Sequence, residues 1–394
     1  MKLIKDFLDR IKPNFQEGGS LNKLHSTFDA LETFLFVPGH TAPSKGAHIR
    51  DGIDLKRTMF TVVIAMLPVF IWGMFNVGYQ HFLSMGEKTV FFSLQNLIFG
   101  AQVALPMVIV SYSVGLGVEF AFAQFRKHPV NEGFLVTGLL IPLSLPPHVP
   151  LWMVGLATIF AVVIGKEVFG GTGMNLLNPA LTARVFLFFA FPTYMTGDTI
   201  WIANQADGYS GATSLTNIAN AKSMPVDGNW ASIFRWDAMD MFFGFEPGSL
   251  GETSVFMCLI GALILFATGI GSWKIIVATF LGGLLGGLIL NIMANFGIGD
   301  AIVYMHMPAY YHLLIGGFAF GAVYMATDPV SAAQTERGKW IYGIGIGIVC
   351  IIIRVFNGAY PEGMMLAILM MNVTAPIIDY YQVQGNIKRR LARA

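Results

Sequence analysis

The chain has 394 residues, of which 55% are hydrophobic and only 12% are charged, and its formal net charge is +1. Soluble domains carry about twice that charged fraction, so the composition is typical of an integral membrane protein. Since no basic stripe or nucleic-acid module is present, nucleic-acid binding is excluded. The two cysteines, Cys258 and Cys350, lie in apolar runs and cannot supply the ligands of a typical iron–sulfur cluster. We expect both thiols to be buried.

The first 57 residues are polar and charged, and they contain no cleavable signal peptide of the usual pattern. Lysine and arginine concentrate on the cytoplasmic side of membrane proteins, so we expect residues 1–57 to form a cytoplasmic segment. The tail 382–394 is basic as well, which predicts that it is also cytoplasmic.

Apolar runs of about 20 residues predict membrane-spanning helices. Ten candidates divide the chain into a first half, 58–194, and a second half, 253–381. The uninterrupted candidates are 58–79, 102–124, 149–165, 253–270, 274–296, 340–356 and 363–381. The shorter or interrupted candidates are 133–146, 180–194 and 311–326. These are either broken helices at a binding site or ordinary tilted helices. We therefore expect an all-α, polytopic transmembrane protein with about ten spans.

Ten spans place both termini on the cytoplasmic side and the long polar loop 195–252 outside the cytoplasm. This threading assigns Lys166 and Arg184 to the inner side and Lys222 to the outer side. The segments Val168–Gly171 and Val355–Gly358 resemble each other, and each precedes the last span of its half. The sequence thus predicts a five-plus-five inverted repeat similar to urea-channel-type folds.

The outer loop contains the heptapeptide Asp207-Gly208-Tyr209-Ser210-Gly211-Ala212-Thr213. Its small residues leave the backbone accessible, so a modifying enzyme could bind it and use the Thr213 hydroxyl as acceptor. By composition alone, the segment is equally typical of an ordinary polar loop. The heptapeptide resembles, however, the flavinylation motif in which a flavin transferase joins FMN through its phosphate to the last threonine. That transferase acts outside the cytoplasm, where the threading places this loop.

The whole chain resembles the B subunit of the sodium-translocating NADH:quinone reductase. The resemblance rests on these blocks: Val37–Gly39, His48–Asp51, Asp54–Arg57, Arg126–His128, Val130–Gly133, Lys166–Gly173, Asn178–Leu181, Met325–Ser331, Tyr360–Met365 and Asn386–Arg393. A related family is the D subunit of the Rnf ferredoxin:NAD complex, which shares the motif and the membrane fold. The long charged N-terminal segment favours the quinone reductase.

The resemblance implies a subunit of a six-subunit bacterial inner-membrane enzyme that carries electrons from NADH to ubiquinone or menaquinone and pumps Na⁺ outward. This subunit would hold covalent FMN and non-covalent riboflavin. Its partners would be the other five subunits (A, C, D, E and F), which carry the NADH, FAD and iron–sulfur chemistry, and the flavin transferase during maturation. The Rnf protein is one alternative. A passive urea-type channel is the other, although a channel has no use for the loop motif.

Riboflavin has no phosphate anchor and needs a pocket with hydrogen-bond partners. We expect Asn175 and Asn178, in the interrupted region before Pro179, to contribute to it, although helix capping would equally explain them. The resemblance also implies a quinone-site role for Gly115. The family has a Gly-Gly pair where this chain has Gly115-Leu116, and close helix packing is the alternative.

Carboxylates in membrane spans are costly, which makes each of them a functional candidate. Glu119 and Asp379 match family positions implicated in Na⁺ uptake, and Asp29 in the N-terminal segment matches a third. Asp379 could instead be an interface residue, and Asp29 could lie on a solvated helix face. The histidines show no metal-ligand spacing, so Na⁺ is the one metal ion that we expect.

Overall fold

The computed structural model describes residues 2–16, isolated positions between 19 and 46, and then 55–126, 133–225, 228–299, 302–358 and 360–393. All regular secondary structure in these ranges is helical, which confirms the all-α prediction. Asp29 lies outside the described residues, as do most of the N-terminal sequence blocks.

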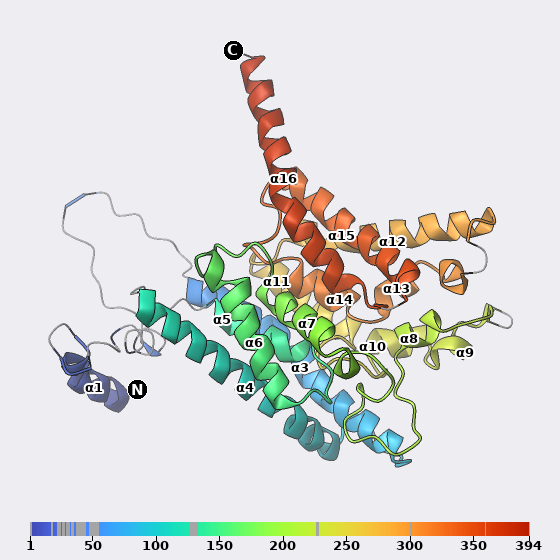
Figure 1. Cartoon of the computed structure of the whole chain (residues 1–394), viewed down its shortest axis with the longest axis horizontal. Coiled ribbons are helices and arrows are strands. Elements are labelled where there is room, and N and C mark those ends of the chain that lie inside the picture. Colours follow the sequence, from blue (N-terminus) through green and yellow to red (C-terminus); the bar gives the residue numbers. More distant parts are fainter. Residues whose placement is uncertain are drawn as a thin grey trace.

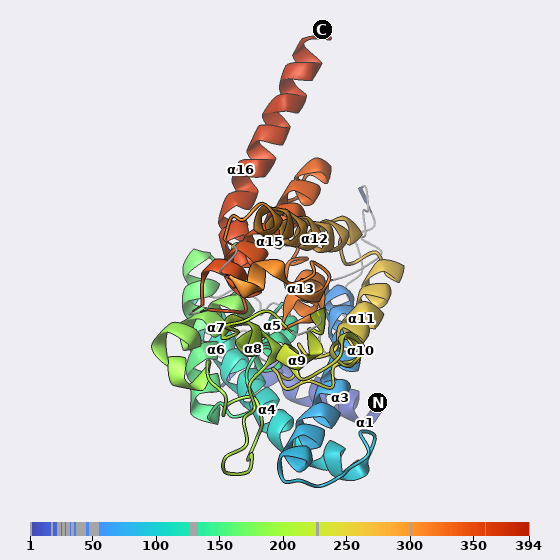
Figure 2. The same ribbon diagram turned by 90° about the vertical axis from the view of Figure 1, so that its right-hand side faces the viewer.

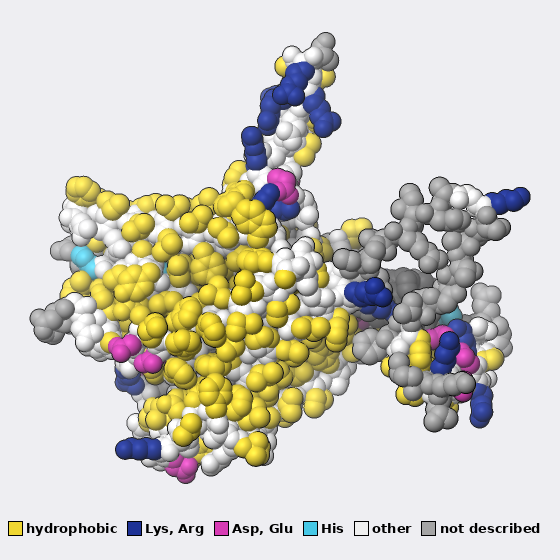
Figure 3. Space-filling model, turned by 180° about the vertical axis from the view of Figure 1, so that it is seen from behind, with side chains coloured by type: hydrophobic (Ala, Val, Ile, Leu, Met, Phe, Trp, Pro, Cys, Tyr) yellow, Lys and Arg dark blue, Asp and Glu magenta, His cyan; other side chains and the backbone are white. Residues whose placement is uncertain are grey.

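Six helices are long and apolar enough to cross a membrane. They are α3 (Leu55–Ser84), α4 (Leu94–Arg126), α6 (Leu151–Gly165) with its following turn to Phe169, α12 (Trp273–Asn295), α15 (Glu336–Phe356) and α16 (Met364–Leu391). One face of the body is covered almost continuously by hydrophobic side chains (Figure 3). The prediction of an integral membrane protein is therefore confirmed.

Three further apolar helices are short: α5 (Phe134–Leu143), α7 (Pro179–Ala190) and α11 (Val255–Ala267). The candidate 253–270 is thus shorter than a full span, because Ser254 caps α11 and Gly269 follows its end with a positive φ of +69°. Thirteen helical residues cover about 20 Å, less than the ~30 Å of a bilayer core.

The tenth candidate, 311–326, is broken. It contains α13 (Tyr311–Leu314), then an extended Ile315, α14 (Phe318–Phe320) and a π-helical turn over Gly321–Met325. Gly316 has a φ of +61°, a conformation that side-chain-bearing residues rarely adopt. The Arg354 guanidinium from α15 binds the freed carbonyl oxygens of His312 (2.6 Å) and Ile315 (3.0 Å). The sequence signal for an interruption here is confirmed.

Glycines allow the long helices to approach closely. A Cβ atom on Gly347 of α15 would lie 2.3 Å from the backbone nitrogen of Gly283 on α12. A Cβ atom on Gly78 of α3 would lie 2.1 Å from the carbonyl oxygen of Asn96 on α4. Small residues at helix contacts are the usual way in which membrane helices pack. In two perpendicular views, α12, α15 and α16 lie on one side of the body and α3 and α4 on the other (Figures 1 and 2).

The long loop between the halves forms short helices: α8 (Ser214–Ala219), α9 (Ala231–Phe234) and α10 (Ala238–Phe243). They build a second hydrophobic cluster, separate from the main core, with Val303–His306 and α13. Ile218 and Phe234 are fully buried in this cluster. The loop is therefore a packed part of the body. Cys258 and Cys350 are free and buried, as predicted.

Candidate functional site

Thr213 is the N-cap residue of α8. Its backbone is extended (φ −78°, ψ 162°), and its Oγ1 accepts a hydrogen bond from the Thr216 backbone nitrogen at 3.4 Å. The hydroxyls of Thr213 and Thr216 also lie 3.2 Å apart. Capping satisfies a backbone donor that the first turn of a helix leaves free. It also holds the Thr213 hydroxyl at a fixed place, half-buried, at the wall of a cavity.

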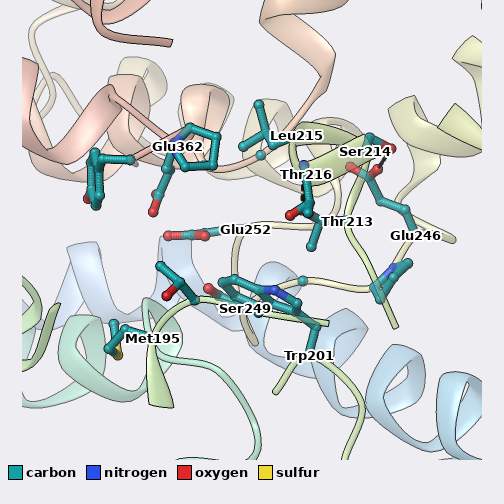
Figure 4. Close-up of a pocket in the computed structure, with 18 of the residues that line it drawn as sticks. Met195, Trp201, Thr213, Ser214, Leu215, Thr216, Glu246, Ser249, Glu252 and Glu362 are labelled. Atoms are coloured by element: carbon teal, nitrogen blue, oxygen red, sulfur yellow. Dashed lines mark hydrogen bonds between the residues drawn. The ribbon is translucent and has the colours of Figure 1, made fainter. Parts of the chain in front are cut away.

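The cavity beside Thr213 has a volume of about 280 Å³. Its wall is built from α7, the loop 195–252, the break at Gly316 and the turn before α16 (Figure 4). Met195, Trp201 and Leu215 contribute apolar side chains to the wall, and Glu246, Glu252 and Glu362 contribute carboxyl groups. Such a mixture, apolar with a few placed polar groups, is typical of small-molecule sites.

A buried ion-pair cluster forms the deep polar wall. Arg184 of α7 is 2% exposed and pairs with Glu252, which precedes α11, and with Glu362, which precedes α16. Its guanidinium also donates to the carbonyl oxygen of Ser144. Two carboxylates therefore share one guanidinium. A Cβ atom on Gly317 would lie 2.9 Å from an oxygen of each glutamate, so only a glycine fits between them.

Glu246 is the third buried acid of the cavity. The Ser214 hydroxyl, next to Thr213 in the chain, donates to its carboxylate. Burial raises the pKa of Glu246 to about 7, while the Ser214 hydrogen bond and the Arg354 charge oppose the increase. Side chains of α3 hold the surrounding turn: Asn76 donates to the Glu246 carbonyl at 2.9 Å, and Gln80 donates to the Phe245 carbonyl at 2.6 Å.

A flavin ring needs an apolar space with hydrogen-bond partners at its edge, and the lining of the cavity contains both kinds of group. Within the described part of the chain, the buried polar atoms at its wall that have no hydrogen-bond partner include the indole nitrogen of Trp201 and Oε1 of Glu362. A buried polar atom without a partner is costly, which favours a bound molecule that supplies one. The volume is close to the lower limit of ligand pockets, about 300 Å³.

The other motif residues surround Thr213 in different ways. Asp207 and Gly208 are exposed. Gly208 has a φ of +78°, a conformation that glycine adopts without the strain that a side chain would cause. The Ser210 carbonyl accepts from Arg235 at 3.4 Å. Gly211 and Ala212 are buried. The motif therefore runs from water into the body of the protein.

Asn175 and Asn178 line a second, smaller cavity of about 150 Å³. Asn178 also caps α7, accepting from the backbone nitrogen of Ala180 at 2.9 Å, and it donates to the Met325 carbonyl at 3.4 Å. Asn175 donates to the Leu177 carbonyl at 3.0 Å. The geometry supports the capping interpretation for Asn178 and leaves both residues at a cavity wall.

Gly115 does not line either cavity. A Cβ atom on it would lie 1.8 Å from the Phe134 ring, so it allows α4 to pack against α5. The close-packing alternative for Gly115 therefore has direct structural support. A ligand role remains a prediction.

Both candidates for Na⁺ uptake that the structure describes, Glu119 and Asp379, form ion pairs or hydrogen bonds within the chain. Glu119 is buried and forms an ion pair with buried Lys166. Asp379 accepts hydrogen bonds from the backbone nitrogens of Gln334 (2.7 Å) and Thr335 (2.9 Å) and from the Thr335 hydroxyl. Asp379 thus ties α16 to the start of α15. The structure does not bring Glu119 and Asp379 together with Thr213 in one cavity.

The profile of the NQR2, RnfD, RnfE family matches residues 42–388 of the chain. The chain belongs to the NQR2, RnfD, RnfE family. It is 47% identical to the B subunit of the Na(+)-translocating NADH-quinone reductase of Ectopseudomonas mendocina. It is 45% identical to the proteins with the same name from Stutzerimonas stutzeri and Azotobacter vinelandii. Each comparison covers 99% of both chains. The family resemblance drawn from the sequence is confirmed.

For this NQR2, RnfD, RnfE family member, sequence reasoning missed the polar wall of the cavity. Arg184, which the threading counted as an inner charge, is buried and paired with Glu252 from the loop 195–252. Lys166 was likewise counted as an inner charge, although it is buried against Glu119. A usable signal existed: arginines inside apolar helices are rare, and such a residue needs a buried acidic partner.

Proposed function

We propose that this chain is the flavin-carrying membrane subunit of a Na⁺-translocating NADH:quinone reductase. It would pass electrons from FMN attached to Thr213, through non-covalent riboflavin, to quinone, coupled to outward Na⁺ transport. The observation that carries the proposal is the position of Thr213, whose motif ends at the wall of a cavity that fits a flavin ring. The relatives aligned over the full length, all named as the quinone reductase protein, favour this function over that of the Rnf protein.

A bound flavin supplies electron transfer in steps of one or two electrons, and the protein determines its place and surroundings. The N-cap geometry of α8 keeps the Thr213 oxygen at the cavity wall. Trp201 and Leu215 contribute apolar side chains to the cavity wall. The cluster of Arg184 with Glu252 and Glu362 supplies fixed charges and hydrogen-bonding groups at the deep end.

The membrane orientation is also part of the proposal. Residues 1–57 and the basic tail 382–394 would be cytoplasmic, and the loop 195–252 would face the periplasm. The lysines and arginines gathered on the projecting end of α16 support this orientation (Figure 3). Residues 58–194 and 253–381 would be inverted repeats in the bacterial inner membrane. We further propose that Asn175 and Asn178 contact riboflavin at the second cavity, and that Gly115 lies near the quinone site.

The covalent flavin is tested on a denaturing gel under ultraviolet light. We expect the chain produced with a flavin transferase to fluoresce, and Thr213→Ala to lose the fluorescence completely, because no other residue would hold the phosphate. Thr216→Ala is the matched control, since it removes a hydroxyl only 3.2 Å from that of Thr213. It should stay fluorescent. A dark parent chain, beside a labelled control flavoprotein from the same cells, would overturn the proposed function.

We propose that Glu119 and Asp379, with Asp29, serve Na⁺ uptake. At Glu119 the ion would have to displace the Lys166 ammonium, because that group now neutralises the carboxylate. We expect Glu119→Gln and Asp379→Asn to raise the Na⁺ concentration for half-maximal quinone reduction about tenfold, equivalent to ~1.4 kcal/mol of binding free energy. Glu336→Gln, an exposed acid at the start of α15, is the control. Unchanged Na⁺ activation in both variants would exclude these residues.

A further inference from the structure

The residues on both sides of Thr213 are buried in the folded chain. Ala212 is 4% exposed, Ser214 1% and Leu215 5%, and Gly211 is buried as well. Thr213 itself is only half-buried, and its hydroxyl lies at the wall of the cavity. The acceptor oxygen therefore faces the cavity, while the residues on both sides of it in the chain are buried.

Each of these neighbours has a specific contact. The Gly211 nitrogen donates to the Asp198 carbonyl at 3.0 Å, and a Cβ atom on Gly211 would lie 2.8 Å from that same oxygen. The Ser214 hydroxyl donates to buried Glu246. Leu215 packs against Gly316 at the helix break. A Cβ atom on Gly316 would lie 2.4 Å from the Leu215 side chain. Contacts with Asp198, Glu246 and Gly316 thus hold the residues beside Thr213 in the body of the protein.

The transfer of FMN to Thr213 requires much more room around the hydroxyl than the attached FMN occupies afterwards. A transferase must place the hydroxyl in line with a phosphorus atom and hold a flavin dinucleotide and the acceptor peptide together. Enzymes that act on peptides usually bind several backbone groups around the target residue. The cavity of about 280 Å³ is a small space for these groups, and the residues directly beside the acceptor, Gly211, Ala212 and Ser214, are buried.

We propose that flavin transfer to Thr213 takes place while the segment 207–219 is undocked, and that docking of α8 then closes the cavity around the attached group. The inference rests on the proposed function. In the transfer, the Thr213 oxygen forms a bond to the phosphorus of the FMN half of a flavin dinucleotide. The bond between the two phosphates breaks, AMP leaves, and the hydroxyl proton passes to a base of the transferase.

Docking of α8 should limit the rate at which Thr213 is modified. In a chain that has already folded, modification must wait for local opening of α8 from its cluster of Ile218, Trp230 and Phe234. Local opening precedes reaction in such a scheme, so the rate is reduced by the small open fraction. At high transferase concentration the rate should become independent of that concentration.

The experiment uses the full chain, purified from cells that lack the transferase and inserted into lipid nanodiscs. Soluble transferase and FAD are then added, and flavin fluorescence per chain is followed over time. A synthetic peptide of residues 204–222, which has no body to dock on, is the comparison. We expect the peptide to react at least ten times faster than the folded chain, and the folded-chain rate to level off with transferase concentration.

Two matched truncations sharpen the test. Ile218→Ala removes a side chain that is 1% exposed in the cluster, and it should increase the rate in the folded chain at least tenfold by favouring opening. Met224→Ala removes a 47% exposed side chain close by and should leave the rate unchanged. The melting profile of each variant shows whether the rest of the chain is folded. The rate of the parent relative to that of the peptide decides the question even if Ile218→Ala does not fold.

The outcomes separate the two proposals. A folded chain that reacts as fast as the peptide, or faster, would overturn the inference and leave the covalent flavin at Thr213 intact. If neither the peptide nor the chain is labelled by a transferase that is active on a control substrate, the proposed function itself would be overturned.

Discussion

Replacing Arg184 with methionine should lower the stability of the chain by about 3–5 kcal/mol, the usual cost of removing one partner from a buried ion pair. The change leaves Glu252 and Glu362 buried beside each other without their shared guanidinium. It also leaves the Ser144 carbonyl without its donor. The measurement is the thermal unfolding midpoint of the purified protein in detergent, followed by tryptophan fluorescence.

Neutralising the acids should recover most of this loss. We expect Arg184→Met combined with Glu252→Gln and Glu362→Gln to unfold close to the parent, because no uncompensated charge then remains buried. Lys222→Met, which removes an exposed cation from the loop 195–252, should change the midpoint little. If Arg184→Met melts like the Lys222 control, the cluster contributes nothing to stability.

Stability should fall as the pH rises from about 4.5 to about 7, and Glu246 should account for part of the fall. Burial raises the pKa of this carboxyl to about 7 in the folded chain, from an ordinary 4.5. The folded state therefore holds the proton more tightly than the unfolded state. Its stabilising effect is complete below pH 4.5 and is lost as the pH passes through 7. The shift corresponds to roughly 3 kcal/mol at 1.36 kcal/mol per pH unit.

The comparison with Glu246→Gln isolates this effect. Glutamine cannot ionise but can still accept from Ser214, so the variant should melt at a midpoint less sensitive to pH. Burial raises the pKa of Glu252 too, but that residue is present in both proteins and its effect cancels. Glu87→Gln, at an exposed position, should retain the pH dependence of the parent. Identical pH profiles for the parent and Glu246→Gln would show that Glu246 does not titrate in this range.

The sequence predicted the features that depend on local composition. Apolar runs gave the long helices, and Gly316-Gly317 lies where the helix over 311–326 breaks. The motif led to Thr213. What the sequence could not show was the partner set of Arg184, because Glu252 and Glu362 lie 68 and 178 positions away along the chain. Only the packing of α7 against the segments before α11 and α16 brings these charges together.

Helix lengths were harder to predict because hydrophobicity alone does not end a helix. The run 253–270 is apolar throughout most of its length, yet α11 ends at Ala267 where Thr268 and Gly269 follow. The role of Asn178 was ambiguous for a similar reason. An asparagine before a proline is as typical of a helix cap as of a ligand-binding residue. In the structure, the side-chain oxygen of Asn178 caps α7.

The buried polar contacts between the halves have a consequence for motion. Arg184 of the first half is paired with acids that precede α11 and α16, and α3 holds the turn at Glu246 through Asn76. Many secondary transporters work by rocking one repeat against the other. Here such rocking would pull an ion pair apart inside the protein, at a cost of several kcal/mol. These ion pairs therefore oppose rocking of one half against the other.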